Sequence, residues 1–155
     1  MDTIYSRNNT GIHFERIRYQ TSGHLEFVDI TDAVEEVVKR SGVQFGMVNI
    51  QSKHTTAAIL INENEPLLLE DFKRLLERLV PEDEEYGHND FTIRTVNMNP
   101  FEDKNGHSHC RALFLPTSQM VNIIDSNIDL GNWQRIFLVE LDKPKDRTIS
   151  VVVLS

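Results

Sequence analysis

The stretch Ala57-Ala-Ile-Leu-Ile-Asn-Glu-Asn-Glu-Pro66, with the leucine-rich segment after it, decides the predicted fold. Its first five residues form an uninterrupted apolar run of the kind found in buried strands. Asn64 is a typical helix cap, and Pro66 suits a first helical turn, where a missing N–H is tolerated. A helix is therefore predicted over 65–79, ended by Pro81. Its apolar residues recur at helical spacing: Leu68, Leu69, Phe72, Leu75, Leu76 and Leu79.

Two short β-type segments open the chain. Residues 13–20 and 24–28 alternate in polarity on either side of Thr21-Ser-Gly23, which is typical of a turn. Together they predict an opening hairpin. Residues 1–12 are polar, and we expect them to form a loosely attached N-terminal extension.

A second helix is predicted over 31–41, where Thr31 provides a cap and Gly42 suits the left-handed position that ends a helix. Residues 44–61 are strand-like throughout. The polar segment 89–106, which contains Pro100, predicts a long loop, and such loops often form part of a site. Further strands are expected at about 107–115, 119–124, 133–142 and 147–154.

These elements predict one α+β domain over residues 1–155, with a mostly antiparallel, β-sandwich-like sheet and two main helices. The 155 residues, 39% of them hydrophobic, are enough to bury a core. The longest apolar run has only five residues and the start of the chain does not read as a signal peptide, so no membrane partner is expected. The single cysteine, Cys110, fits a reducing compartment and hence a cytoplasmic location.

The charge of the chain limits its possible partners. Lys and Arg number 16 against 24 Asp and Glu, which gives a net charge of −8. A general polyanion-binding surface is disfavoured, so no nucleic-acid partner is expected. A site for a small anion would have to gather its positive charge locally.

The segment Asn105-Gly-His-Ser-His-Cys-Arg111 contains two imidazoles one residue apart. In the strand expected here, residues at i and i+2 point to the same face. His107 and His109 would then lie side by side, with Arg111 on the same stripe. Such a stripe suits two ligands of one metal ion or a set of donors facing an anion. A solvated outer strand face is the alternative.

Two other segments place a histidine beside small polar residues: Lys53-His-Thr-Thr56 and Tyr86-Gly-His-Asn89. Taken singly, the first also fits a hydroxyl-rich strand entry and the second a solvated loop. His13 and His24 lack such a setting and are expected at the surface. We expect four histidines to converge on one pocket that holds a divalent metal or a phosphate-like anion: His54, His88, His107 and His109.

Several motifs occur in order along residues 13–154. They are His54-Thr-Thr-Ala-Ala-Ile-Leu-Ile-Asn-Glu-Asn-Glu65, Asp71, Tyr86-Gly-His-Asn89, Asn105-Gly-His-Ser-His109, Leu130-Gly-Asn-Trp-Gln-Arg135 and Glu140-Leu-Asp142. In this order the motifs resemble the YjbQ-like family of small uncharacterised proteins, which is associated with a secondary thiamine-phosphate synthase activity. The resemblance implies a compact, mostly β domain with packed helices that assembles as a homotrimer. It also implies a polar pocket around the histidines for a metal or a phosphate-like anion.

The chain departs from the family pattern at two turns. Leu115-Pro-Thr-Ser118 stands where the family usually has a glycine-serine turn, and a proline there removes one N–H donor from any anion cradle. Asp125-Ser-Asn-Ile-Asp129 is more acidic than the family norm. Trp133 is retained and is expected to anchor a core or an interface.

Two functions of different classes are expected from these residues. The first is a transferase that joins a pyrimidine diphosphate to a thiazole phosphate and releases pyrophosphate, with catalytic roles for His54, Glu63, Asp71 and Arg111. The reaction needs positive charge at the leaving diphosphate, supplied by the histidines, Arg111 and a divalent ion (zinc, nickel or magnesium). The second is a non-catalytic homotrimer that binds a metal, an inorganic anion or a small phosphorylated metabolite in the same pocket.

Overall fold

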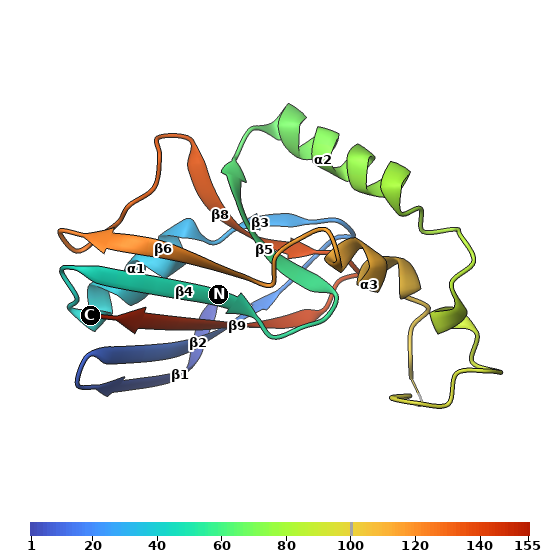
Figure 1. Ribbon diagram of the computed structural model, residues 1–155, viewed down its shortest axis with the longest axis horizontal. Helices are drawn as coiled ribbons and strands as arrows, with labels where there is room; N and C mark the ends of the chain where they lie inside the picture. The colour runs from blue at the N-terminus through green and yellow to red at the C-terminus, as the bar shows by residue number, and fades with distance from the viewer. Residues whose placement is uncertain (100) are drawn as a thin grey trace.

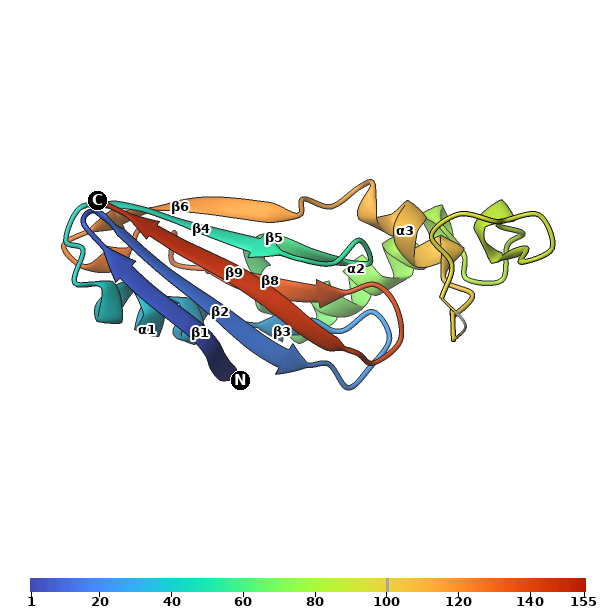
Figure 2. The same ribbon diagram turned by 90° about the horizontal axis from the view of Figure 1, so that it is seen from below.

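The strands form two antiparallel sheets, seen in the computed structural model of Figures 1 and 2. The structure describes residues 1–99 and 101–155; Pro100, expected within a long loop, lies outside them. The larger sheet has the strand order β1 (Asp2–Asn9), β2 (Ile12–Gln20), β9 (Asp146–Leu154), β4 (Gly46–Ser52), β6 (Ser118–Ile124) and β7 (Asn127–Ile128). The smaller sheet has the order β3 (Phe27–Asp29), β8 (Gln134–Glu140) and β5 (Ala57–Glu63).

The main core lies between the two sheets and helix α1 (Thr31–Ser41). Val48 and Val151 of the larger sheet, Ile59 and Leu138 of the smaller one and Val34 of α1 belong to one cluster, each with 0% of its surface exposed. Burial of this much apolar surface provides most of the stabilisation of such a domain. The predicted α+β class with a sandwich-like antiparallel sheet is confirmed.

Helix α2 (Pro66–Leu79) lies beside the smaller sheet, and its buried residue Leu76 belongs to a second cluster with Phe137. Its start confirms the predicted helix, with one difference in the cap. The Glu65 carboxylate accepts hydrogen bonds from the amides of Leu67 and Leu68, at 2.9 and 2.7 Å, in the place expected for Asn64. A carboxylate at this end also suits the positive end of the helix dipole.

The predicted opening hairpin is wrong. Strand β2 pairs with β1 on one side and with β9 on the other, whereas β3 pairs with β8 in the smaller sheet. The turn at 21–23 therefore leads from one sheet to the other. Strand β1 occupies most of the segment 1–12, which was expected to be a loosely attached extension.

The segment 115–118, where the chain departs from the family pattern, connects the two sheets. The Pro116 carbonyl accepts a hydrogen bond from the Ile59 amide at 2.9 Å, and the Thr117 carbonyl accepts one from the Ser52 amide at 2.8 Å. Ile59 lies in β5 and Ser52 in β4, so this segment ties the sheets together through its backbone. The N–H that proline lacks is not needed for these contacts, since both use carbonyls.

The chain between α2 and the short helix α3 (Gly106–Ala112) extends from one end of the molecule, while α1 lies at the other end (Figures 1 and 2). It includes one short 3₁₀ turn at Gly87–Asn89. Among the described residues, each helix falls short of the length and apolar character needed to cross a membrane.

Candidate functional site

The segment that carries the His-x-His motif is helical, so the strand predicted over 107–115 is wrong. Gly106 begins α3 directly against Tyr86, and a Cβ atom at Gly106 would lie 2.5 Å from the Tyr86 Cβ. The Gly106 amide also donates to the Asn89 side-chain oxygen at 2.9 Å. Only a glycine fits this approach, and the Tyr86–Asn89 segment holds the helix start in place.

His107 and His109 consequently point to different sides, because residues i and i+2 of a helix lie about 200° apart. The expectation that they share one face is wrong for this reason. The His109 ring lies 4.6 Å from the His88 ring, measured between centroids. The His107 ring instead lies 5.9 Å from the ring of His24 and 6.3 Å from that of Tyr86.

His54 lies in a third place, in the connection between β4 and β5. Its Nε2 accepts a hydrogen bond from the Thr148 amide at 2.7 Å, which ties this connection to β9. A metal ion could bind this nitrogen only by displacing the Thr148 amide that holds the β4–β5 connection to β9. The structure thus divides the four expected ligands among three places: His54 alone, His88 with His109, and His107 with His24.

The other expected catalytic residues are also separated. Glu63 ends β5, and Asp71 lies exposed on α2, where it pairs with Arg74. Neither lines the cavity beside α3. Arg111 does not line this cavity either, but it contacts a residue that does: it is completely buried, and its guanidinium donates to the Val80 carbonyl and to His24 Nε2, both at 3.0 Å.

A cavity of about 420 Å³ lies beside α3, and we call it the α3 cavity. Two imidazoles, two lysines and three carboxylates line it: His24, His107, Lys104, Lys143, Glu82, Asp103 and Asp142. These residues come from four separate parts of the chain, which α3 and the turn after β8 bring together. Its volume is in the range of pockets that hold small molecules.

A larger hollow of about 810 Å³ runs along the loop 82–93. Its lining includes one lysine and five carboxylates: Lys104, Glu82, Asp83, Glu84, Glu85 and Asp90. This excess of negative charge disfavours a phosphorylated ligand there. The α3 cavity, where two lysines and two imidazoles face three carboxylates, is the better candidate despite its smaller size.

Asp142 is one of the residues that line the α3 cavity. Its carboxylate accepts a hydrogen bond from the Asn105 side-chain amide at 2.9 Å and pairs with Lys145. Burial alone would raise the pKa of Asp142, but the bonds from Asn105 and Lys145 outweigh it and hold the pKa below the ordinary value. Asp142 therefore stays ionised and fixed at neutral pH.

Buried polar atoms without a partner gather at α3. Within the described part of the chain, five buried side-chain polar atoms lack a hydrogen-bond partner, and four lie in or directly before this helix. They are Asn105 Oδ1, His107 Nδ1, Ser108 Oγ and Arg111 Nη2. Because buried polar groups in proteins are nearly always paired, this concentration marks α3 as a candidate binding site.

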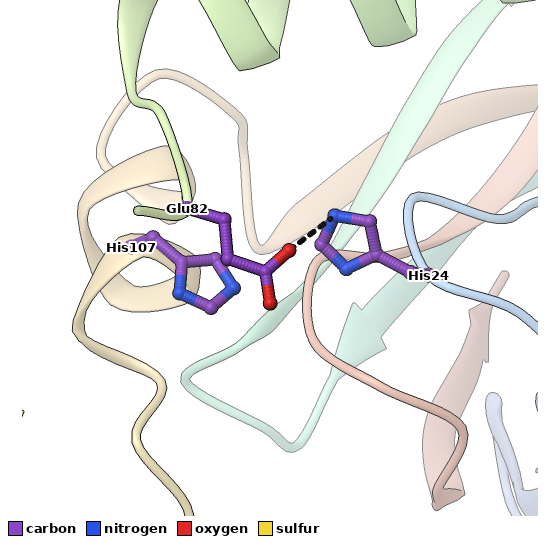
Figure 3. A group of neighbouring side chains, drawn as sticks. All are labelled: His24, Glu82 and His107. Carbon is purple, nitrogen blue, oxygen red and sulfur yellow. Dashed lines mark ion pairs between the residues drawn. The ribbon is translucent and has the colours of Figure 1, made fainter. Parts of the chain in front are cut away.

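The sequence did not indicate several of the residues that meet at this site. His24 was expected at the surface as a residue without a role, and Glu82 was not among the expected site residues. Their Nε2 and Oε2 atoms lie 3.5 Å apart (Figure 3). His13, also expected at the surface, is 5% exposed and contacts the buried Glu15 carboxylate at 2.8 Å. Among these missed residues, only Asp142 could have been found from the sequence, because it belongs to the quoted motif Glu140-Leu-Asp142.

The comparisons with known proteins agree with the motifs. Residues 15–155 match the model of the family described as UPF0047 protein YjbQ-like. This chain belongs to that family. A UPF0047 protein of Methanothermobacter thermautotrophicus is 42% identical over 92% of both chains, and one of Archaeoglobus fulgidus is 36% identical over 87% of this chain and 96% of its own. The resemblance expected from the sequence is thereby confirmed.

Solved structures of relatives share the fold. A YbjQ-like protein of unknown function from Sulfolobus solfataricus P2 is 36% identical and superposes with a TM-score of 0.82 over 93% of this chain and 97% of its own. A hypothetical protein from Aeropyrum pernix K1 gives a TM-score of 0.80 at 30% identity, over 92% of this chain and 98% of its own. The two-sheet architecture is therefore that of the YjbQ-like family.

Acidification is expected to destabilise this protein. Burial lowers the pKa of His107, and nearby Arg111 adds to the effect; burial also lowers the pKa values of His54 and His109. With folded pKa values below the unfolded value of about 6.5, the unfolded state binds more protons as pH falls. Stability should then be greatest above pH 6.5 and decrease below it.

Urea unfolding at pH 7.0 and at pH 5.5 measures this decrease, and the variant His107→Gln should show a smaller one. NMR titration of the imidazole protons should give a midpoint for His107 below about 6.5. A midpoint above that value, or equal stability at the two pH values, would contradict the expectation.

Proposed function

We propose that this protein is a transferase that acts on a small phosphorylated metabolite in the α3 cavity, with the joining of a pyrimidine diphosphate and a thiazole phosphate as its reaction. One observation carries the proposal: Lys104 and Lys143 line the same cavity as the imidazoles of His24 and His107. The chain is acidic overall, so this local gathering of donors is what a bound phosphate requires.

The chemistry asks little of the protein beyond positive charge and orientation. In the transfer, the carbon–oxygen bond to the diphosphate breaks, a carbon–nitrogen bond to the thiazole forms, and pyrophosphate leaves. Ammonium groups such as those of Lys104 and Lys143 stabilise the charge that develops on the leaving group. A divalent ion held with the diphosphate would add to this stabilisation, and Glu82 is an exposed carboxylate of the cavity that could reach it.

A non-catalytic binding protein is the second candidate. Two observations favour it. Asp142 is held in a fixed, ionised state, and among the described residues around His107 no side chain is evidently set up as a general base with its own orienting partner. Such a protein would hold a phosphorylated metabolite or an inorganic anion in the α3 cavity. A cytoplasmic location, which suits the single Cys110, is part of both proposals.

Complementation separates the two candidates. A strain that lacks thiamine-phosphate synthase should grow without thiamine when it produces this protein, and should fail to do so with His107→Ala. The control Lys39→Ala, which changes an exposed ion pair on α1, should restore growth as well as the unchanged protein. Failure of the unchanged protein, when it accumulates in folded form, would favour the binding protein.

We propose further that the chain assembles as a homotrimer. Helix α2 leaves large apolar side chains uncovered, with Leu67 74% and Leu79 52% exposed, and Trp133 before β8 is 74% exposed. Apolar groups of this size are commonly covered in an assembly. The role of Trp133 is then that of an interface residue, since its exposure excludes a place in the core of one chain.

Sedimentation at micromolar concentration should give three times the mass of one chain, and Leu67→Glu with Trp133→Glu should shift the mass towards that of a monomer. An unchanged protein that sediments with the mass of one chain would contradict the proposed assembly.

A further inference from the structure

His24, Glu82 and His107 come from three separate segments and all line the α3 cavity; Figure 3 shows their side chains together. His24 lies in the connection between β2 and β3, Glu82 follows α2, and His107 lies in α3. One potential ligand atom of each residue lies within 4.8 Å of those of the other two. In Figure 3 the Glu82 carboxylate lies between the two rings, and each ring turns a nitrogen towards it.

We infer that these three residues form a binding site for one divalent transition-metal ion of the zinc, cobalt or nickel class. Two imidazoles and one carboxylate are a ligand set that these ions accept, whereas magnesium prefers oxygen ligands alone. Three protein ligands leave a fourth position of a tetrahedral ion open towards the cavity. Of these three residues, only His107 is among the four ligands expected from the sequence. The site is therefore different from the expected one.

The side chains of the proposed site differ in mobility in a way that suits metal binding. His107 is 3% exposed and is held between the rings of Tyr86 and His24, so the direction of its ring is fixed. The Glu82 side chain is 63% exposed and lies in a loop, so it can move the short distance needed to close around an ion. Metal–ligand bonds of about 2.0–2.2 Å require the three ligand atoms to draw closer together than they stand.

Arg111 sets the conditions for binding. It donates from Nη1 to His24 Nε2 at 3.0 Å, and because a guanidinium never accepts, this nitrogen is unprotonated and already carries a lone pair. An ion that takes this lone pair releases the Arg111 bond, and Nη1 joins Nη2 as a free donor. The positive charge of Arg111 opposes the ion, so an anion bound at the open position is expected to strengthen metal binding.

The test measures metal alone, without any substrate of the proposed transfer. Chelator-treated protein is titrated with Co²⁺, whose visible absorption reports tetrahedral coordination, and with Zn²⁺ by calorimetry. We expect one ion per chain and at least a tenfold weaker affinity for His24→Ala and for Glu82→Gln. Glu84→Gln, in the same acidic loop but outside the α3 cavity, should bind like the unchanged protein.

Thermal unfolding of each variant shows whether it is folded, so that a loss of metal binding can be assigned to the lost ligand. No binding to the unchanged protein, or binding that is lost with His88→Ala but kept with His24→Ala, would overturn the inference. Inorganic phosphate added with the metal should increase the affinity, as the position of Arg111 requires. Since no transfer is measured, failure here leaves the proposed reaction standing, and failure of the transfer leaves this site standing.

Discussion

Replacing Arg147 with alanine is expected to lower the free energy of unfolding by about 3–5 kcal/mol, because it leaves a buried carboxylate without its cation. Glu140 is 0% exposed and Arg147 3%. The Arg147 Nε atom donates to Glu140 Oε2 at 2.6 Å, and Arg147 also donates to Thr56 Oγ1 at 3.1 Å. The remaining bonds, from Thr21 Oγ1 at 2.8 Å and from the Asp142 amide at 2.9 Å, are from neutral donors and cannot compensate for the lost charge.

Urea denaturation followed by circular dichroism measures this loss, with Lys39→Ala as the control. Lys39 pairs with Glu36 on the exposed face of α1, where water screens the charges, so the control should unfold like the unchanged protein. Equal losses for Arg147→Ala and Lys39→Ala would mean that the buried pair does not support the fold as described.

Reversing both lysines of the α3 cavity, Lys104→Glu with Lys143→Glu, is expected to weaken pyrophosphate binding by about 100-fold at low ionic strength, because two attractive charges become repulsive. Both lysines are exposed, but Lys143 pairs with Asp103, so urea unfolding of the variant must show that it is folded. Calorimetric titration with pyrophosphate measures the change, and Lys39→Glu, which alters the net charge on α1 far from this cavity, is the matched control.

The effect should also shrink as salt is added, because exposed charges are screened within about 8 Å at physiological ionic strength. If the double variant and the Lys39→Glu control bind pyrophosphate equally, the ligand does not bind in the α3 cavity.

Much of the fold could be predicted from sequence periodicity. The apolar residues of α2 and the strand before it follow helical and buried-strand patterns, and both elements form where expected. The short helix α3 was missed because seven residues carry too little periodicity, and its histidine spacing imitates a strand. Its formation depends instead on tertiary contacts, chiefly the close packing of Gly106 against Tyr86. Pairing of β2 with β9 was equally invisible, since those strands lie over 120 residues apart.

The candidate site was predicted in part. His107 and Arg111 were identified from their own segment, where polar residues interrupt an otherwise regular pattern. His107 lines the α3 cavity, and Arg111 contacts His24 of its lining. His24 and Glu82 were not identified, since each is unremarkable in its own turn or loop and gains its setting only from residues far along the chain. Glu63 and Asp71 were given roles through the resemblance, and the fold places them away from the α3 cavity.

The most direct test of the proposed reaction is product formation by the purified protein. Supplied with the pyrimidine diphosphate and the thiazole phosphate, it should form thiamine phosphate and pyrophosphate in equal amounts, and only when both substrates are present. The Lys104→Glu/Lys143→Glu variant should be at least about tenfold slower, because its cavity no longer stabilises the leaving diphosphate. No product above the uncatalysed rate, from protein that is folded and binds pyrophosphate, would contradict the transferase proposal.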